Sequence, residues 1–179
     1  RNKSFLCVGL DPDPTLLPEH LASQPDPIFQ FCKSIVDATH DLVLAFKPQI
    51  AYFASQAAEQ QLRRLIEYIH LNTKIPVILD AKRADIASTS RMYAEEAFEV
   101  YGADAVTVNP YFGLDSLQPF LDRKDKGVII LCRTSNPGGA EIQNIKTADG
   151  SPIYEVVARK AAVEWNNNGN VLLVAGATH

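Results

Sequence analysis

The chain has 179 residues, of which 46% are hydrophobic and 21% charged, and its formal net charge is −4 at pH 7. This length and composition are typical of one soluble globular domain with a sizeable core. Seventeen basic against twenty-one acidic residues leave no basic patch, so binding to nucleic acid through its phosphates is not expected. No apolar stretch approaches the ~20 residues of a membrane-spanning helix, and we expect no membrane association.

The cysteines and histidines are scattered along the sequence. Cys7, Cys32 and Cys132 form an odd, widely spaced set without a C-x-x-C motif, which favours reduced thiols packed in the core of a cytoplasmic protein. The histidines have no metal-ligand spacing, so we expect no metal site. The chain begins at Arg1 rather than Met and shows no signal peptide, and we interpret it as a fragment of a longer protein.

Apolar runs and helical periodicities alternate along the whole chain. In chain order, the sequence predicts a strand at 5–10, a helix at 27–43, a strand at 44–47, a helix at 54–71, a strand at 76–82, a helix at 88–101, a strand at 105–109, a short helix at 114–121, a strand at 127–133, a helix at 153–167 and a strand at 171–175. The Gly-rich, polar segment 134–151 is expected to be a loop.

Six β-then-α units at roughly thirty-residue spacing predict a parallel sheet in an α/β fold. An open doubly wound sheet and a (β/α)₈ TIM barrel both fit this pattern. Polar residues at the carboxyl ends of several strands favour the barrel, and no G-x-G-x-x-G motif follows the first strand. These strand-end residues are Asp11, Lys47, Asp80, Lys82, Asn109 and Arg133. We therefore predict one barrel domain over 1–179, of which this chain supplies about six β/α units and lacks the last two.

The most informative motif is Asp80-Ala81-Lys82-Arg83-Ala84-Asp85, at the end of the apolar strand 76–82. Side chains alternate along a strand, so Asp80 and Lys82 are expected on one face, with Asp85 curling back toward Lys82. Lys47 ends the preceding strand, and strands lie roughly 4.8 Å apart, so Lys47 can reach Asp80. The predicted array of two lysines and two carboxylates suits an ammonium that sits beside a negative substrate and delivers a proton. A structural ion-pair cluster is the alternative.

Further motifs accompany this one from end to end of the chain. They are Val8-Gly9-Leu10-Asp11, Phe46-Lys47-Pro48-Gln49, Asn109-Pro110-Tyr111-Phe112-Gly113, Thr134-Ser135-Asn136-Pro137-Gly138 and Val174-Ala175-Gly176-Ala177-Thr178. Together with the central motif, they make the chain resemble the orotidine 5′-monophosphate decarboxylase family, in its second bacterial-type sequence group. Sister sugar-phosphate decarboxylases share Asp-x-Lys-x-x-Asp, so the whole set carries the resemblance. Ala84 stands where this group usually has Gly, a mild change unless the backbone needs positive φ.

The resemblance implies a carboxy-lyase that converts orotidine 5′-monophosphate to UMP in pyrimidine biosynthesis, without metal or organic cofactor. Decarboxylation leaves a carbanion at C6 that no ring position delocalises, so nearby positive charge must stabilise it. Lys82 would supply that charge and then protonate the carbon. Asp80 would lie against the departing carboxylate, while Lys47 and Asp85 would hold the array in place.

The resemblance also implies substrate-binding residues, which are Asp11, Ile86, Thr89, Asn109 and Ser135. Asp11 would accept hydrogen bonds from the ribose hydroxyls, and Ser135 would bind the pyrimidine edge. Both residue types also occur in ordinary turns, which is the structural alternative for each.

In this family, the equivalents of Asp85 and Thr89 reach into the partner subunit's site, which implies a homodimer with composite active sites. The family's phosphate-gripping glutamine and arginine have no counterpart in a sequence that ends at His179.

Three other functions stay open. A 3-keto-L-gulonate 6-phosphate decarboxylase would need magnesium and an extra acid near Lys47, where this chain has Phe46-Lys47-Pro48-Gln49. A Schiff-base aldolase would use Lys82 as nucleophile, but such a lysine needs a depressed pKa and flanking carboxylates act in the opposite direction. The third is a non-catalytic phosphosugar-binding barrel or a degenerate partner domain. The four-charge motif argues against this third function.

Overall fold

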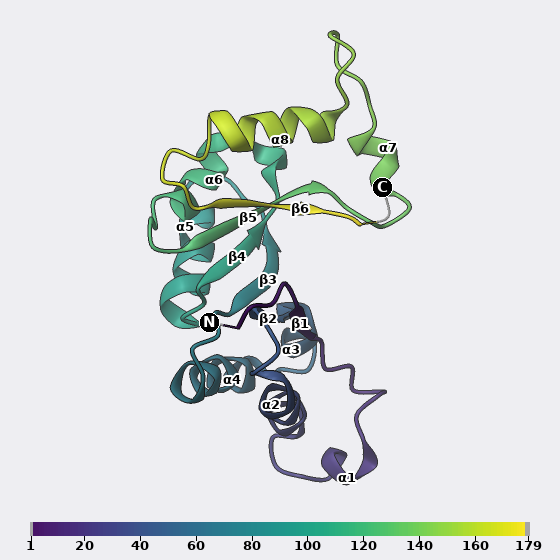
Figure 1. Ribbon diagram of the computed structural model, residues 1–179, viewed down its shortest axis with the longest axis vertical. Helices are drawn as coiled ribbons and strands as arrows, with labels where there is room; N and C mark the ends of the chain where they lie inside the picture. Colours follow the sequence, from purple (N-terminus) through teal and green to yellow (C-terminus); the bar gives the residue numbers. More distant parts are fainter. Residues whose placement is uncertain (1, 178–179) are drawn as a thin grey trace. The chain divides into compact units, whose positions relative to one another are not determined.

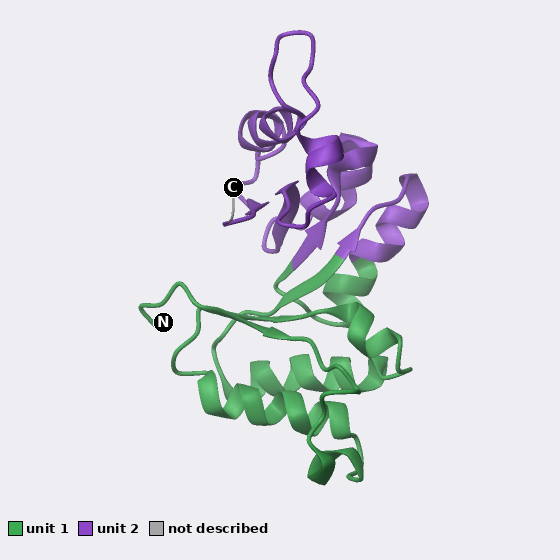
Figure 2. Cartoon of the chain, turned by 90° about the vertical axis from the view of Figure 1, so that its right-hand side faces the viewer, with its two compact units in different colours: residues 1–81, 95–105 green, residues 82–94, 106–179 purple. Residues whose placement is uncertain are grey.

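A computed structural model describes residues 2–177 of the chain. Parallel strands alternate with helices along it, as in an α/β fold (Figure 1). The chain separates into two compact units, coloured green and purple in Figure 2. Unit 1 comprises Arg1–Ala81 and Glu95–Ala105, and unit 2 comprises Lys82–Ala94 and Val106–His179.

Unit 1 contains the first two strands and the helices that follow them. Its elements are β1 (Cys7–Leu10), α1 (Glu19–Ala22), α2 (Pro27–Thr39), β2 (Ala45–Pro48), α3 (Ile50–Ala54), α4 (Glu59–Asn72) and the π-helical turn η1 (Glu96–Val100). β1 pairs in parallel with β2. Single parallel bridges join Phe46 to Val77 and Gln49 to Asp80, so β2 also lies beside the chain that begins the third strand.

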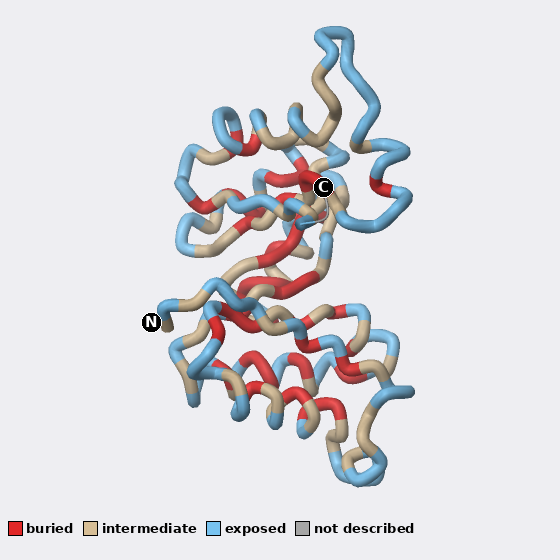
Figure 3. Tube along the Cα trace, turned by 45° about the vertical axis from the view of Figure 1, so that its right-hand side comes forward, coloured by how far each residue is buried: buried red, intermediate tan, exposed pale blue. Residues whose placement is uncertain are grey.

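Helix α4 of unit 1 buries one apolar stripe. On α4, the residues Leu62, Leu65, Ile66 and Ile69 recur at the three-to-four spacing of a helix face, and none is more than 1% exposed. This face packs against α2 and α3. Figure 3 shows the resulting pattern, in which buried positions (red) recur along the helices between exposed ones (blue). The buried stripe therefore holds α4 against α2 and α3.

Unit 2 contains the later strands and their helices. Its elements are the end of β3 (Ile78–Arg83), α5 (Ala87–Glu95), β4 (Ala105–Val108), the 3-10 turn η2 (Pro110–Phe112), α6 (Leu114–Leu121), β5 (Gly127–Arg133), α7 (Gly139–Gln143), α8 (Ile153–Val163) and β6 (Val171–Ala175). The strands follow one another in the order β3-β4-β5-β6. Helix α8 packs on β5 and β6 (Figure 1).

The strand order identifies the fold class. The strands among the described residues neighbour one another in sequence order, in the sets β1-β2 and β3-β4-β5-β6. Doubly wound sheets reverse their order at a switch point, whereas (β/α)₈ barrels do not. The chain therefore has the predicted (β/α)₈ barrel fold, of which the described residues supply six parallel strands.

Several local predictions are wrong. The helix predicted at 54–71 begins only at Glu59, as α4, and a separate short helix, α3, precedes it, because Ala57 adopts a left-handed backbone with φ of 50° between them. The segment 134–151, predicted to be a loop, contains α7. Cys32 and Cys132 are buried as predicted, whereas Cys7 is exposed and is not a core residue.

Two further properties bear on function. Within residues 2–177, no helix has the length and apolar character needed to cross a membrane. Ala84 is not among the described non-glycine residues with positive φ, which are Asp26, Ala57, Lys82 and Ala87. Alanine is therefore accommodated at position 84 without backbone strain.

Candidate active site

Lys47 and Asp80 form an ion pair at the ends of two neighbouring parallel strands of unit 1. The ammonium nitrogen of Lys47 lies 3.0 Å from Oδ2 of Asp80. The parallel bridge between Gln49 and Asp80 explains this contact, because it brings the carboxyl end of β2 beside Asp80 on β3. The Asp80 side chain is only 9% exposed and that of Lys47 32%. The predicted contact between these residues is thus present, and its carboxylate is largely removed from water.

Lys82 begins unit 2, and its backbone departs from the predicted extended strand. Its φ is 46°, a left-handed conformation that costs a non-glycine residue of order 1–2 kcal/mol. Its N–H donates to Oγ1 of Thr107 on β4 at 2.9 Å. A left-handed residue changes the local direction of the backbone, which regular alternation along a strand does not include. Non-glycine residues in this conformation cluster at functional sites, where the surrounding structure holds them.

Asp85 is held by its neighbours in unit 2. Its Oδ1 accepts from the N–H of Ile86 at 2.8 Å, and its carbonyl oxygen accepts from the hydroxyl of Ser116 on α6. Ser90 is fully buried, and its hydroxyl donates to the carbonyl oxygen of Ser116 at 2.5 Å. The start of α5 is therefore anchored to α6 through Ser116.

The predicted residues on the first turn of α5 point away from this anchor. Ile86 is 58% exposed, and Thr89 is exposed as well. Ala87, between them, is left-handed with φ of 44°. An exposed isoleucine beside an exposed threonine at a helix start is an accessible surface within unit 2. The array of Lys47, Asp80, Lys82 and Asp85 has two members in each unit, and its complete assembly remains a prediction.

Asp11 and Ser135 follow strands in different units. Asp11 is exposed directly after β1, and Ser135 is exposed two residues after β5. Ser135 is packed closely by Gly176, after β6: a Cβ on Gly176 would lie 3.1 Å from the Ser135 nitrogen and 3.2 Å from its Cβ. The serine backbone is therefore fixed by a neighbouring strand end, while its side chain stays accessible.

Asn109 lies at the edge of a cavity of about 380 Å³ in unit 2. Its Oδ1 accepts from the N–H of Tyr111 at 3.1 Å and so caps the turn η2. The cavity is also lined by Thr134 and Gln143, and by Cys132. Burial raises the pKa of the Cys132 thiol, and its Sγ contacts the Tyr154 carbonyl oxygen at 3.1 Å, so it is a protonated packing group. The cavity thus places amide and hydroxyl groups beside the chain that leads to Ser135.

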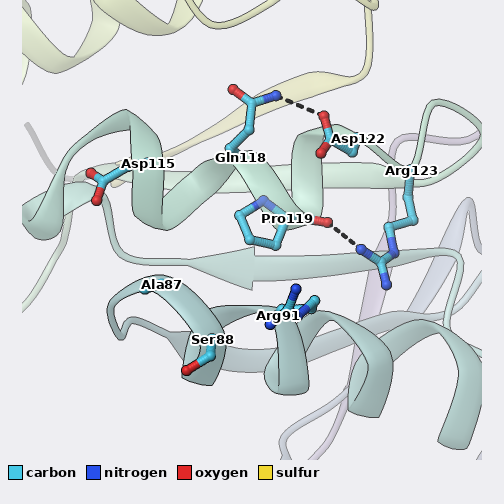
Figure 4. A pocket seen from close by; sticks show the side chains of 8 residues that line it. All are labelled: Ala87, Ser88, Arg91, Asp115, Gln118, Pro119, Asp122 and Arg123. Carbon is cyan, nitrogen blue, oxygen red and sulfur yellow. Dashed lines mark hydrogen bonds between the residues drawn. The ribbon is translucent and has the colours of Figure 1, made fainter.

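A second cavity, of about 530 Å³, lies between α5 and α6 in unit 2 (Figure 4). Two of its polar side chains form hydrogen bonds to residues four positions away. Gln118 donates to Asp122 at 2.7 Å, and Arg123 donates to the Pro119 carbonyl oxygen at 2.6 Å. Its lining residues include none of those predicted for the site. Within the described part of the chain, no group of three or more His, Cys, Asp or Glu side chains is arranged to hold a metal ion.

Comparisons with known proteins identify the family. The profile of the orotidine 5′-phosphate decarboxylase / HUMPS family matches residues 4–179. Orotidine 5′-phosphate decarboxylase of Ralstonia pickettii (strain 12J) is 63% identical, over 99% of this chain and 66% of that protein. The chain belongs to the orotidine 5′-phosphate decarboxylase / HUMPS family, as the sequence motifs predicted. It spans about two thirds of the length of the curated relatives it matches, 66% of the Ralstonia pickettii protein and 65% of the one from Aromatoleum aromaticum.

Solved structures agree with this assignment. The Leishmania donovani OMP decarboxylase superposes with a TM-score of 0.88 at 42% identity, covering 99% of this chain and 67% of that one. The Leishmania donovani UMP synthase superposes with a TM-score of 0.87 at 42% identity, covering 98% of this chain and 37% of that one. The fold and the family therefore rest on sequence and structure together.

The residues that hold the predicted ones have no signal in the sequence. Thr107 binds the backbone of Lys82, Ser116 binds that of Asp85, and Gln143 binds that of Thr134. Each contact joins positions 9 to 31 residues apart. No local pattern in the sequence signals such pairs, because they depend on how the elements pack.

Proposed function

We propose that this protein decarboxylates orotidine 5′-monophosphate to UMP and carbon dioxide in de novo pyrimidine biosynthesis. The observation that carries the proposal is the Lys47–Asp80 ion pair, 3.0 Å long, at adjacent strand ends of a member of this family. Active sites of (β/α)₈ barrels are built at this end of the strands. The relatives at 60–63% identity are named orotidine 5′-phosphate decarboxylase, which disfavours the keto-gulonate alternative.

The proposed chemistry uses the charges of the Asp-x-Lys-x-x-Asp motif. The bond between C6 and the carboxyl carbon breaks, its electron pair stays on C6, and carbon dioxide leaves. The Lys82 ammonium stabilises the carbanion and then donates a proton to C6, giving UMP. Asp80 lies against the departing carboxylate, and Lys47 and Asp85 hold the array. A fixed ammonium in a site that excludes water stabilises such charge far better than bulk solvent does.

The remaining predicted residues bind the substrate in this proposal. Asp11 accepts hydrogen bonds from the ribose hydroxyls, and Ser135 binds the pyrimidine edge. Asn109 borders the cavity next to the Ser135 segment, and its amide is available to the same ligand. Ile86 and Thr89, both exposed where α5 begins, also contact the substrate.

We further propose a cytoplasmic homodimer with composite sites, in which residues 1–179 belong to one barrel domain. Thr89 and Asp85 of one subunit complete the site of the other. No metal or organic cofactor takes part in the proposed reaction, since the ammonium supplies the positive charge that a metal would otherwise provide.

A direct assay tests the function. The full-length protein is mixed with orotidine 5′-monophosphate, and UMP and carbon dioxide are measured by chromatography and isotope release. We expect stoichiometric formation of both products, at a rate that dialysis against EDTA does not change. Absence of UMP would contradict the proposal. Activity that falls after dialysis and returns with magnesium would assign the protein to the metal-dependent keto-gulonate branch.

A further inference from the structure

The side chain of Gln143 forms hydrogen bonds to Arg133 and Thr134, the two residues that precede Ser135. It is the last residue of α7, and its side chain reaches back toward the end of β5. Its Oε1 accepts from the Thr134 N–H at 3.0 Å and from an Arg133 guanidinium nitrogen at 2.8 Å. Its Nε2 donates to Oγ1 of Thr134 at 2.8 Å. One amide group therefore holds both the backbone and the side chain of the residue that precedes Ser135.

The space around this amide is closed by Gly139, the first residue of α7. A Cβ at Gly139 would lie 2.7 Å from Oγ1 of Thr134, 3.1 Å from Oε1 of Gln143 and 3.3 Å from the Arg133 guanidinium. Real Cβ atoms do not approach an oxygen to 2.7 Å, so any larger residue would displace the threonine hydroxyl from Gln143. The absence of a side chain at this position is thus a condition for the contact.

The other side of the Ser135 segment is fixed by β6. The N–H of Gly176 donates to the Arg133 carbonyl oxygen at 2.7 Å. The pairing of β5 with β6 is irregular between Leu131 and Arg133, just before this segment. Such irregularities change the direction of a strand, and they often occur beside active sites. The chain from Arg133 to Ser135 is therefore held from two sides, by β6 through Gly176 and by α7 through Gln143.

We propose that Gln143 is a positioning residue, which sets the Ser135 hydroxyl for the pyrimidine by fixing Thr134. The inference rests on the proposed function, because it assigns Gln143 a role through the serine that binds the substrate. Gln143 acts through Thr134: its Oε1 accepts from the Thr134 N–H and the Arg133 guanidinium, and its Nε2 donates to the Thr134 hydroxyl. A misplaced serine hydroxyl weakens binding and turnover together.

A double-mutant cycle tests this role in the full-length protein. The variants are Gln143→Leu, Ser135→Ala and the double variant, with kcat/KM measured for orotidine 5′-monophosphate. We expect Gln143→Leu to lower kcat/KM by about 10-fold in the native background. In the Ser135→Ala background, the same substitution should change kcat/KM by less than about twofold, because residues that act through one another are not additive.

Matched variants separate positioning from stability. Asn144→Leu places the same side chain at the adjacent, exposed position and should leave kcat/KM within about twofold of the native value. Gln143→Asn keeps a polar side chain that is too short to reach Thr134, and should reproduce the loss if Gln143→Leu does not fold. Gln143→Glu keeps the acceptor oxygen, and the threonine hydroxyl can rotate to donate to it. This conservative variant should recover most of the lost kcat/KM.

The outcomes distinguish the two proposals. If the native protein forms no UMP, or if Ser135→Ala has no effect, the proposed function or its serine is wrong and the positioning role falls with it. If Ser135→Ala lowers kcat/KM but folded Gln143→Leu and Gln143→Asn do not, only the positioning role is overturned. An equal loss from Gln143→Leu in both backgrounds would also overturn it, since the amide would then act independently of the serine.

Discussion

The Lys47 ammonium lies 3.0 Å from Oδ2 of Asp80, across two neighbouring parallel strands, with the carboxylate 9% exposed and the lysine side chain 32% exposed. Removing one member of a largely buried ion pair leaves the other charge without its counterion in a poorly solvated place. The pair is therefore a structural contact and, in the proposed function, part of the site. The structural contact predicts an effect on the free energy of unfolding, and the proposed part in the site predicts an effect on activity.

Substitution of Lys47 by Met should affect both properties. We expect a loss of about 1–2 kcal/mol in the free energy of unfolding, less than for a fully buried pair because the lysine is one-third exposed. The rate of decarboxylation should fall by about 100-fold or more, as when one electrostatic group is removed from an active site. Urea denaturation and a steady-state assay measure the two quantities.

The matched control is Lys160→Met. Lys160 pairs with Glu164 at 2.8 Å, but both side chains are well exposed, at 43% and 55%. Its loss should change the free energy of unfolding by less than about 0.5 kcal/mol and leave the rate unaltered. Equal effects of the two substitutions would show that the site pair has no special role.

The buried stripe of α4 predicts a large stability difference between two leucines of one helix. Leu65 is fully buried, so Leu65→Ala should lower the free energy of unfolding by about 2–5 kcal/mol through lost burial and a residual cavity. Leu71, on the same helix, is 78% exposed, and Leu71→Ala should cost less than about 0.5 kcal/mol. Urea denaturation measures both, and similar losses would contradict the assigned orientation of α4.

Cysteine alkylation tests the burial of Cys32. Burial raises the pKa of this thiol to about 12. The thiolate is the reactive form, and at pH 8 it would be roughly one molecule in ten thousand. Iodoacetamide followed by mass spectrometry should therefore modify exposed Cys7 well before Cys32 in the native protein, while in urea all thiols react. Rapid native labelling of Cys32 would show that its helix opens or packs differently.

Complementation tests the composite dimer. Lys82→Ala and Asp85→Ala chains should each be inactive alone. Mixed under conditions that exchange subunits, they should form heterodimers that carry one intact site, with Lys82 from one chain and Asp85 from the other. Random pairing at equal concentrations restores about a quarter of the native sites. Exchange without recovered activity would mean that both residues serve the same subunit's site, and the composite arrangement would be abandoned.

Much of the fold could be predicted from the sequence, because its signals are local. The apolar runs at 127–133 and 171–175 coincide with β5 and β6, and 114–121 coincides with α6. The break between α3 and α4 could not be predicted, since Ala57 is an ordinary helix former and alanine does not favour the positive φ that it adopts. Helix α7 was missed for the opposite reason. Its Gly-rich, polar sequence resembles a loop, and its side-chain contacts to the end of β5 accompany its order.

In the candidate site, too, some features could be predicted from the sequence and others could not. The contact between Lys47 and Asp80 followed from strand spacing alone, because the two residues lie on adjacent parallel strands. The left-handed backbone of Lys82 did not follow, since lysine has no preference for positive φ and the conformation is held by distant Thr107. The contacts of Gln143 could not be predicted for a similar reason. An amide that binds a backbone nine positions earlier leaves no periodic or compositional trace.

In the proposed reaction, Lys82 donates the proton that completes decarboxylation, and its substitution separates this role from a structural one. Carbon dioxide release from orotidine 5′-monophosphate is compared for the native full-length protein, Lys82→Ala and the exposed-lysine control Lys74→Ala, with circular dichroism to verify folding. We predict that Lys82→Ala folds and has no detectable release, while Lys74→Ala keeps the native rate. A folded Lys82→Ala variant that retains more than about a tenth of the native rate would contradict the claim, because loss of a positioned acid costs at least about 100-fold.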